Sequence, residues 1–195
     1  TRYISMPVGI HFLKQAQHFM ETEELAVLLK RIPEGLANDP EIVHMKDIVK
    51  RKQATAIGCK FVDFTMSTPE GKTAKLSEYA GNGKVVLVDF WASWCAPCCS
   101  AIPGLIKIYE QYKDKGFEIV AVSLDQDAKA WKEAIRKMNM SWPQLTDLKA
   151  WKSEGVKSYA VGTIPYTILI DAGGKIIARN LHGDELEKAI AESVK

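Results

Sequence analysis

Residues 84–98 read KVVLVDFWASWCAPC, an apolar run followed closely by two cysteines three positions apart. The continuous apolar and β-branched residues of 84–90 predict a strand that is buried on both faces. After Cys95 the apolar residues recur near helical spacing, which predicts a helix that begins at the cysteine pair. The sequence therefore places Cys95 and Cys98 between a core strand and the first turn of a helix.

Two thiols at the start of a helix favour redox chemistry. The partial positive charge of a helix N-terminus stabilises a thiolate, so we expect Cys95 to be the nucleophile of disulfide exchange. Cys98 is then the thiol that resolves the mixed disulfide. The alternatives are a zinc ligand pair and two inert buried thiols. Zinc needs four ligands, and neither a second cysteine pair nor a histidine at ligand spacing accompanies this pair.

Two further residues are candidates for the same site. Asp89 lies inside the predicted core strand, where burial raises the pKa of a carboxyl group, and a proton acceptor near Cys98 is one interpretation. The other interpretation is a strand-end carboxylate that reaches solvent. Pro165 precedes the predicted strand 166–170. A proline cannot donate a backbone hydrogen bond, so within a sheet it belongs at the first residue or the edge of a strand. The Ile164–Pro165 bond can be cis or trans on sequence alone.

Strand-like and helical segments alternate from residue 56 onward. The pattern predicts strands over 61–65, 72–76, 84–90, 117–123, 166–170 and 175–178, and helices after Cys95 and over 127–138 and 183–194. A βαβ unit followed by a hairpin and a final helix predicts an α/β fold, with a mixed central sheet and helices on both faces.

Residues 1–55 are predicted to form a helical arm or the remnant of an upstream domain. Apolar residues recur near helical spacing over 7–20, and Thr22 before two glutamates is typical of an N-cap. Asp39 and Pro40 open a third helix, with proline at the favoured first position.

Composition and charge exclude several classes of protein. The 195 residues include 26 basic and 24 acidic ones, and a net charge of +2 gives no electrostatic reason to expect nucleic acid. No apolar run approaches the ~18–20 residues of a membrane span, and no signal peptide is visible. Because the chain begins with Thr1 and not Met, we expect a mature or trimmed product, with a membrane contact only through an anchor that precedes it. We expect no cofactor and no metal.

Residues 85–98 closely resemble the active-site strand and motif of the thioredoxin superfamily. Further segments resemble the TlpA/ResA-like, AhpC/TSA-related branch: residues 57–65, Trp142-Pro143, 159–161 and 169–176. The resemblance implies a thioredoxin-like domain over 56–195. It also implies thiol-disulfide exchange with protein thiols or disulfides, an unidentified redox donor, and a periplasmic or otherwise extracytoplasmic place in the bacterial envelope. Ala-Pro between the cysteines is close to the Gly-Pro of reducing thioredoxins, which favours the reducing direction.

The resemblance also implies a role for six residues. Cys95 and Cys98 match the redox pair, and Asp89 matches the buried aspartate of the family. Three more match residues at the substrate-binding surface: Trp94 the active-site tryptophan, Pro165 the cis-proline that packs against the disulfide, and Ile164 the residue that pairs with substrate backbone.

Departures from the family pattern leave other functions open. Cys99 stands where many members have Lys or Arg, and Ala101 replaces the glutamate of relatives in cytochrome c maturation, which argues against that role. We interpret Cys59 and Cys99 as bystanders. One alternative function is a thiol peroxidase of the peroxiredoxin type, although the usual Pro-x-x-x-Thr segment is missing before Cys95. Another is a copper-binding or partner-binding module, with His182 as the downstream ligand candidate.

Overall fold

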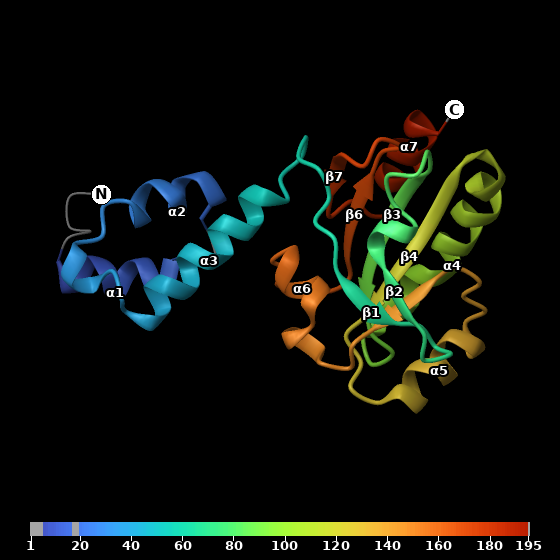
Figure 1. Ribbon diagram of the computed structural model, residues 1–195, viewed down its shortest axis with the longest axis horizontal. Coiled ribbons are helices and arrows are strands. Elements are labelled where there is room, and N and C mark those ends of the chain that lie inside the picture. The colour runs from blue at the N-terminus through green and yellow to red at the C-terminus, as the bar shows by residue number, and fades with distance from the viewer. Residues whose placement is uncertain (1–5, 17–19, 195) are drawn as a thin grey trace. The chain divides into compact units, whose positions relative to one another are not determined.

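The computed structural model describes residues 6–16 and 20–194, and contacts divide the chain into two compact units, Thr1–Ala54 and Thr55–Lys195. The first unit is helical, as its sequence pattern predicts (Figure 1). Residues 17–19 of the predicted helical stretch 7–20 lie outside the described residues. The helices of this unit are α1 (Pro7–Ala16), α2 (Thr22–Leu29) and α3 (Pro40–Ala54), with a short 3₁₀ helix at Glu34–Leu36.

Apolar side chains of the three helices form a small core of their own. The buried members are Ile10, Leu13, Leu25, Ala26, Leu29, Ile42, Met45 and Val49. The spacing within each helix is that of one apolar stripe, so the core follows from the helical period. The predicted N-cap of α2 is wrong by one residue, because Glu21 takes that position and Thr22 is the first helical residue.

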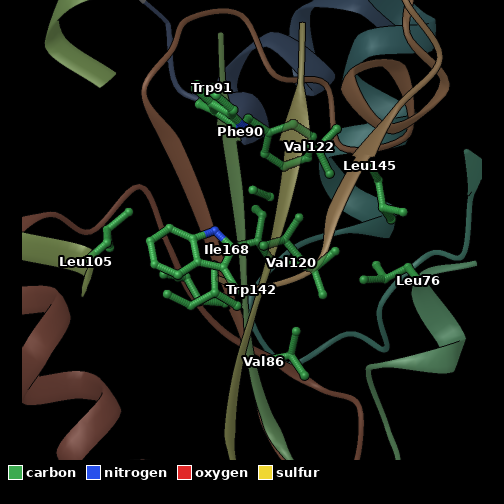
Figure 2. Packing of buried hydrophobic residues seen from close by; sticks show 14 of the residues in the cluster. Leu76, Val86, Phe90, Trp91, Leu105, Val120, Val122, Trp142, Leu145 and Ile168 are labelled. Atoms are coloured by element: carbon green, nitrogen blue, oxygen red, sulfur yellow. The ribbon is translucent and has the colours of Figure 1, made fainter. Parts of the chain in front are cut away.

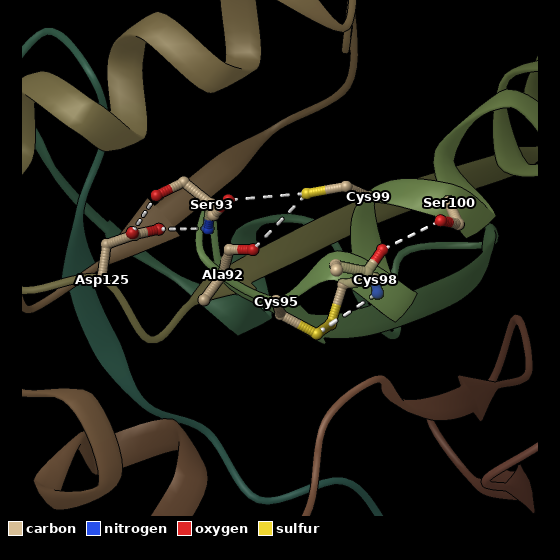
Figure 3. Close-up of a disulfide and its surroundings, with 8 residues drawn as sticks. Ala92, Ser93, Cys95, Cys98, Cys99, Ser100 and Asp125 are labelled. Carbon is tan, nitrogen blue, oxygen red and sulfur yellow. Dashed lines mark hydrogen bonds between the residues drawn. A yellow bond between two sulfur atoms is a disulfide. The ribbon is translucent and has the colours of Figure 1, made fainter.

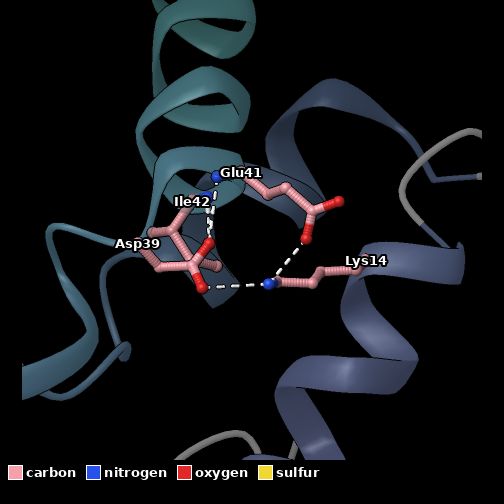
Figure 4. A network of polar contacts seen from close by, with 4 residues as sticks. All are labelled: Lys14, Asp39, Glu41 and Ile42. Atoms are coloured by element: carbon pink, nitrogen blue, oxygen red, sulfur yellow. Dashed lines mark hydrogen bonds and ion pairs between the residues drawn. The ribbon is translucent and has the colours of Figure 1, made fainter.

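A polar network fixes the start of α3 (Figure 4). The Asp39 side chain accepts hydrogen bonds from the backbone N–H groups of Glu41 (2.9 Å) and Ile42 (3.3 Å), which satisfies two donors that the helix leaves open. The ammonium of Lys14 in α1 contacts Asp39 at 3.0 Å and Glu41 at 2.6 Å. These contacts raise the pKa of Lys14, and the Lys14 hydrogen bond lowers the pKa of Asp39.

The second unit contains one seven-stranded mixed sheet of order β2-β1-β5-β4-β3-β6-β7. Its strands are β1 (Thr65–Ser67), β2 (Thr73–Lys75), β3 (Val85–Trp91), β4 (Phe117–Ser123), β5 (Gln144–Thr146), β6 (Tyr166–Ile170) and β7 (Ile176–Arg179). Its helices are α4 (Ala96–Tyr112), α5 (Ala128–Lys137), α6 (Glu154–Ser158) and α7 (Gly183–Ser193). The mixed sheet with flanking helices confirms the predicted α/β architecture.

The strand that leads to the cysteine pair is β3, which lies between β4 and β6, and all seven of its residues are buried. This confirms the interpretation of its continuous apolar run, since helices cover both faces of a sheet of this kind. Figure 2 shows the packing, in which Leu105 of α4 and the indole of Trp142 lie against the strands.

The register brings four strand termini to one edge of the sheet. β3 pairs in parallel with β4, Trp91 opposite Ser123, and β4 pairs in parallel with β5, Ser123 opposite Thr146. β6 runs antiparallel to β3, with Tyr166 opposite Phe90. The carboxyl ends of β3, β4 and β5 and the start of β6 therefore share this edge, which we call the redox edge.

Two features of the sheet differ from the sequence-based expectation. The predicted strand 61–65 is wrong over most of its length, because β1 begins only at Thr65. The preceding segment instead makes single backbone contacts with the chain near β7, such as the bridge between Lys60 and Lys175. The sequence pattern did not predict β5 or α6, which have three and five residues.

Candidate active site

A disulfide joins Cys95 and Cys98 at the redox edge, where β3 gives way to α4 (Figure 3). The two Cα atoms are 5.2 Å apart. Cys95 is the N-cap of α4, and its Sγ accepts a hydrogen bond from the backbone N–H of Cys98 at 3.2 Å. Both cysteines are buried, at 5% and 2% exposure, while the neighbouring Trp94 is 56% exposed. The sequence-based placement of this pair is correct.

Asp125 holds the loop that leads into the cysteine pair. Its carboxylate accepts hydrogen bonds from the backbone N–H of Ser93 (3.0 Å), the Ser93 hydroxyl and the Ser123 hydroxyl (2.7 Å). Asp125 is 2% exposed, so these donors replace the water that the carboxylate has lost. The sequence-based reasoning did not identify this residue, because its partner Ser93 is 32 positions away in the chain.

A cleft of about 360 Å³ lies beside the pair, bordered by Asp89, Cys98, Pro165 and His182 among others. Asp89 is 3% exposed, and burial raises the pKa of its carboxyl group to about 7. No residue that the structure describes donates a hydrogen bond to this carboxyl group or forms an ion pair with it. Asp89 thus shares one cleft with Cys98, as an acid that titrates near neutral pH.

The Ile164–Pro165 peptide bond is cis. Pro165 directly precedes β6 and lines the cleft together with Cys98. The structure therefore brings together three predicted site residues, Asp89, Cys98 and Pro165. Trp94 and Ile164 do not line the cleft: Trp94 points into solvent, and Ile164 is half-buried against the core.

The two remaining cysteines lie outside the disulfide. The Cys99 thiol faces the backbone carbonyls of Ser93 (3.6 Å) and Ala92 (3.9 Å), away from the disulfide (Figure 3). Burial raises the pKa of the Cys99 thiol, and the charge of Asp125 adds to this rise. Cys59 is half-buried in the segment before β1, where its carbonyl accepts the N–H of Ile176 at 2.9 Å.

His182 lines the cleft, and its ring lies 3.1 Å from the side-chain oxygen of Asn180. Within the described residues, no group of three or more His, Cys, Asp or Glu side chains is arranged to hold a metal ion. In the same part of the chain, no helix has the length and apolarity that a membrane crossing requires.

Comparison with known proteins finds relatives that share one described activity. Residues 57–179 match the AhpC/TSA family model. A thiol-disulfide oxidoreductase ResA of Bacillus thuringiensis subsp. konkukian is 30% identical over 145 residues, which are 74% of this chain and 80% of the relative. A ResA of Geobacillus kaustophilus is 29% identical over 185 residues, 93% of this chain and 98% of the relative.

Solved structures give the same result. The thioredoxin domain of a thiol-disulfide oxidoreductase from Bacteroides vulgatus superimposes with a TM-score of 0.66 at 36% identity, over 72% of this chain and 99% of that one. A thiol:disulfide interchange protein from Bacteroides sp. has a TM-score of 0.65 at 35% identity, over 72% of this chain and 91% of that one. The second unit therefore has a thioredoxin-like fold.

Proposed function

The chain belongs to the AhpC/TSA family and is a thiol-disulfide oxidoreductase, and we propose that it reduces protein disulfides through Cys95 and Cys98. The observation that carries this proposal is the disulfide at the start of α4, beside a cleft that also contains Asp89. In this arrangement the nucleophile Cys95, the resolving thiol Cys98 and the proton acceptor Asp89 lie at the redox edge.

Cys95 begins the reaction in the dithiol form. The helix N-terminus and the Cys98 N–H both stabilise negative charge on its sulfur. The Cys95 thiolate attacks one sulfur of the substrate disulfide, so the substrate S–S bond breaks and a mixed disulfide with Cys95 forms. The other substrate sulfur leaves as a thiolate and takes up a proton.

Cys98 completes the reaction. Its thiol loses a proton and attacks the Cys95 sulfur, which releases the second substrate thiol and forms the Cys95–Cys98 disulfide. The substrate gains two electrons and two protons, and the cysteine pair loses them. Asp89 shares the cleft with Cys98 and has a pKa of about 7, so we assign it the role of proton acceptor for Cys98.

Substrate contact is assigned to Trp94, Ile164 and Pro165. Trp94 offers an exposed indole beside the nucleophile, and Pro165 borders the cleft at the start of β6. The substrates are protein disulfides, and an unidentified thiol donor restores the dithiol. We place the protein in the bacterial envelope, outside the cytoplasm, and assign residues 56–195 as the catalytic domain and residues 1–55 as an appended helical arm.

The test is reduction of insulin disulfides by the full chain with dithiothreitol as the electron donor. Cys95→Ser removes the nucleophile and is expected to abolish the reaction, while Cys98→Ser is expected to accumulate the mixed disulfide. Cys99→Ser is the matched control, because its thiol faces away from the disulfide, and it is expected to keep full activity. Full activity of the Cys95→Ser variant would show that the assignment is wrong.

Equilibrium with glutathione tests the direction of the reaction. A reductant has a standard potential near that of thioredoxin, about −270 mV, and strong oxidants lie near about −120 mV. We expect a value in the lower half of this range. A value above about −180 mV, the potential of protein disulfide isomerase, would contradict a reducing role.

A further inference from the structure

The segment between β5 and α6 displays an exposed tryptophan. Among the described residues of 55–194, three large apolar side chains are exposed: Ile57 (65%), Trp94 (56%) and Trp151 (45%). Trp151 lies in the 3₁₀ helix Ala150–Lys152. An indole presents a large, rigid apolar area, and tryptophan is enriched among the residues that dominate the energy of protein–protein contacts.

Trp151 and Trp94 follow strands that end at the redox edge. β3 ends at Trp91 and β5 ends at Thr146, and both pair in parallel with β4 through Ser123. The two loops therefore leave the sheet at the same edge, on either side of the loop that follows β4. Ile57 belongs to the other edge, because its neighbour Gly58 donates a hydrogen bond to Ile176 in β7.

The loop that carries Trp151 is held in place at several points. The Asp147 carboxylate accepts the backbone N–H groups of Lys149 (3.2 Å) and Glu154 (2.9 Å), on either side of Trp151. Leu148 and Ala150 have φ angles of 56° and 49°. Residues other than glycine rarely adopt this left-handed conformation unless their surroundings impose it. The loop is therefore held in one conformation, and this conformation exposes Trp151.

One chain of hydrogen bonds connects the two tryptophan loops. Asp125 accepts from Ser93, next to Trp94, and from the Ser123 hydroxyl. The Thr146 hydroxyl donates to the carbonyl of Ser123 at 3.2 Å, and the N–H of Leu148 donates to the Thr146 hydroxyl at 3.1 Å. The same buried groups thus fix both loops relative to the end of β4.

We propose that Trp151 is a second substrate contact, which binds a large apolar side chain of the protein segment whose disulfide Cys95 attacks. This inference rests on the proposed function and adds a substrate preference to it. The ends of β3 and β5 are two strand spacings apart, about 10 Å. An extended chain covers this distance in about three residues. With this strand-end separation as the scale, we assign the preferred apolar residue to about three positions from the substrate cysteine.

The test uses peptides with one cysteine in a disulfide with 5-thio-2-nitrobenzoate and either Phe or Ala three positions away. The protein is the full chain with Cys59→Ser, Cys98→Ser and Cys99→Ser combined, so that Cys95 is the remaining thiol. Its thiolate attacks the peptide sulfur and releases the coloured thionitrobenzoate. We expect the Phe peptide to react about tenfold faster than the Ala peptide, a difference of about 1.4 kcal/mol.

Trp151→Ala is expected to reduce this ratio to below about twofold, since the apolar contact is lost. Ile57→Ala is the matched control and is expected to keep the ratio, because it removes an exposed apolar side chain at the other edge. An unchanged ratio in Trp151→Ala, or no preference for Phe in the parent protein, would overturn this inference but not the proposed function. Failure of both peptides to release thionitrobenzoate would instead overturn the proposed function.

Discussion

Two buried carboxylates flank the redox pair, and they differ in what surrounds them. Asp125 lies beneath the loop before Cys95 and accepts three hydrogen bonds from Ser93 and Ser123. Asp89 lies on the cleft side, beside Cys98, and accepts none from the described residues. The comparison separates two uses of one functional group: a satisfied carboxylate positions a loop, and an unsatisfied one keeps a pKa at which it can exchange protons.

The largest expected effect is the stability gained when Asp89 loses its charge. Its pKa in the folded protein is about 7, above its ordinary 3.8, so the folded protein binds this proton more tightly than the unfolded chain. The contribution of Asp89 to stability is therefore most favourable below about pH 4 and is lost as the pH rises from about 4 to about 7. A difference of about three pKa units corresponds to about 4 kcal/mol. We expect Asp89→Asn to raise the free energy of unfolding of the oxidised protein by about this amount at pH 8.

Denaturant unfolding followed by tryptophan fluorescence measures this effect, since all five tryptophans lie in the second unit. At pH 4 the Asp89→Asn variant and the parent protein are expected to have similar stability. A difference of the same size at pH 4 and pH 8 would show that the buried charge of Asp89 is not its cause.

Removal of the other carboxylate is expected to act in the opposite direction. Asp125→Ala leaves the Ser93 N–H and two hydroxyl groups without their acceptor in a buried site. Unmatched buried donors cost about 1–3 kcal/mol each, and relaxation of the exposed side of the loop offsets part of this, so we expect a loss of about 3 kcal/mol. The same unfolding measurement checks it. Asp125→Asn, which keeps one acceptor oxygen, is expected to recover part of the loss, and equal stability of Asp125→Ala and the parent protein would contradict the positioning role.

The next effect concerns the rate of reaction. Asp89→Asn cannot accept the Cys98 proton, and general acid–base catalysis of this kind typically contributes about 100-fold or more. We expect insulin reduction at pH 7 to slow about 100-fold, with accumulation of the mixed disulfide on Cys95. The release of substrate thiol after rapid mixing measures this step. Asp125→Asn is the matched control, and an equal slowing in both variants would remove the distinction between the two carboxylates.

The sequence predicted Asp89 and the redox pair because their signals are local. A carboxylate within the run KVVLVDF contradicts the apolar pattern around it, and two cysteines between a strand and a helix form a recognisable unit. The core strands β3, β4 and β6 are rich in apolar residues over their whole length, and these runs placed the three strands correctly.

Asp125 and Trp151 were not predicted because their roles depend on contacts between residues that are far apart in the sequence. Asp125 is one of two aspartates in SLDQD after a strand, and only the pairing of β3 with β4 reveals Ser93 as its partner. β5 was missed for a related reason. It has three residues, and buried Gln144 and Thr146 at its ends break the apolar pattern of a core strand. Without β5, nothing in the sequence places Trp151 at the redox edge.

The smallest effect tests whether Asp125 also acts through its charge. Burial and the charge of Asp125 raise the pKa of the Cys99 thiol, and the thiolate is the form that reacts with iodoacetamide. In the oxidised protein, Cys95 and Cys98 are protected by their disulfide, so mass spectrometry of digested protein reports Cys99 separately from Cys59. We expect Asp125→Asn to speed alkylation of Cys99 by about threefold at pH 8, because loss of the neighbouring negative charge lowers the pKa of the thiol. A wider opening of the loop would also speed the reaction, but it would do so equally at every pH. Only a shift of the pH profile towards lower pH supports the electrostatic effect, and an unshifted profile would leave Asp125 with hydrogen bonding as its sole contribution.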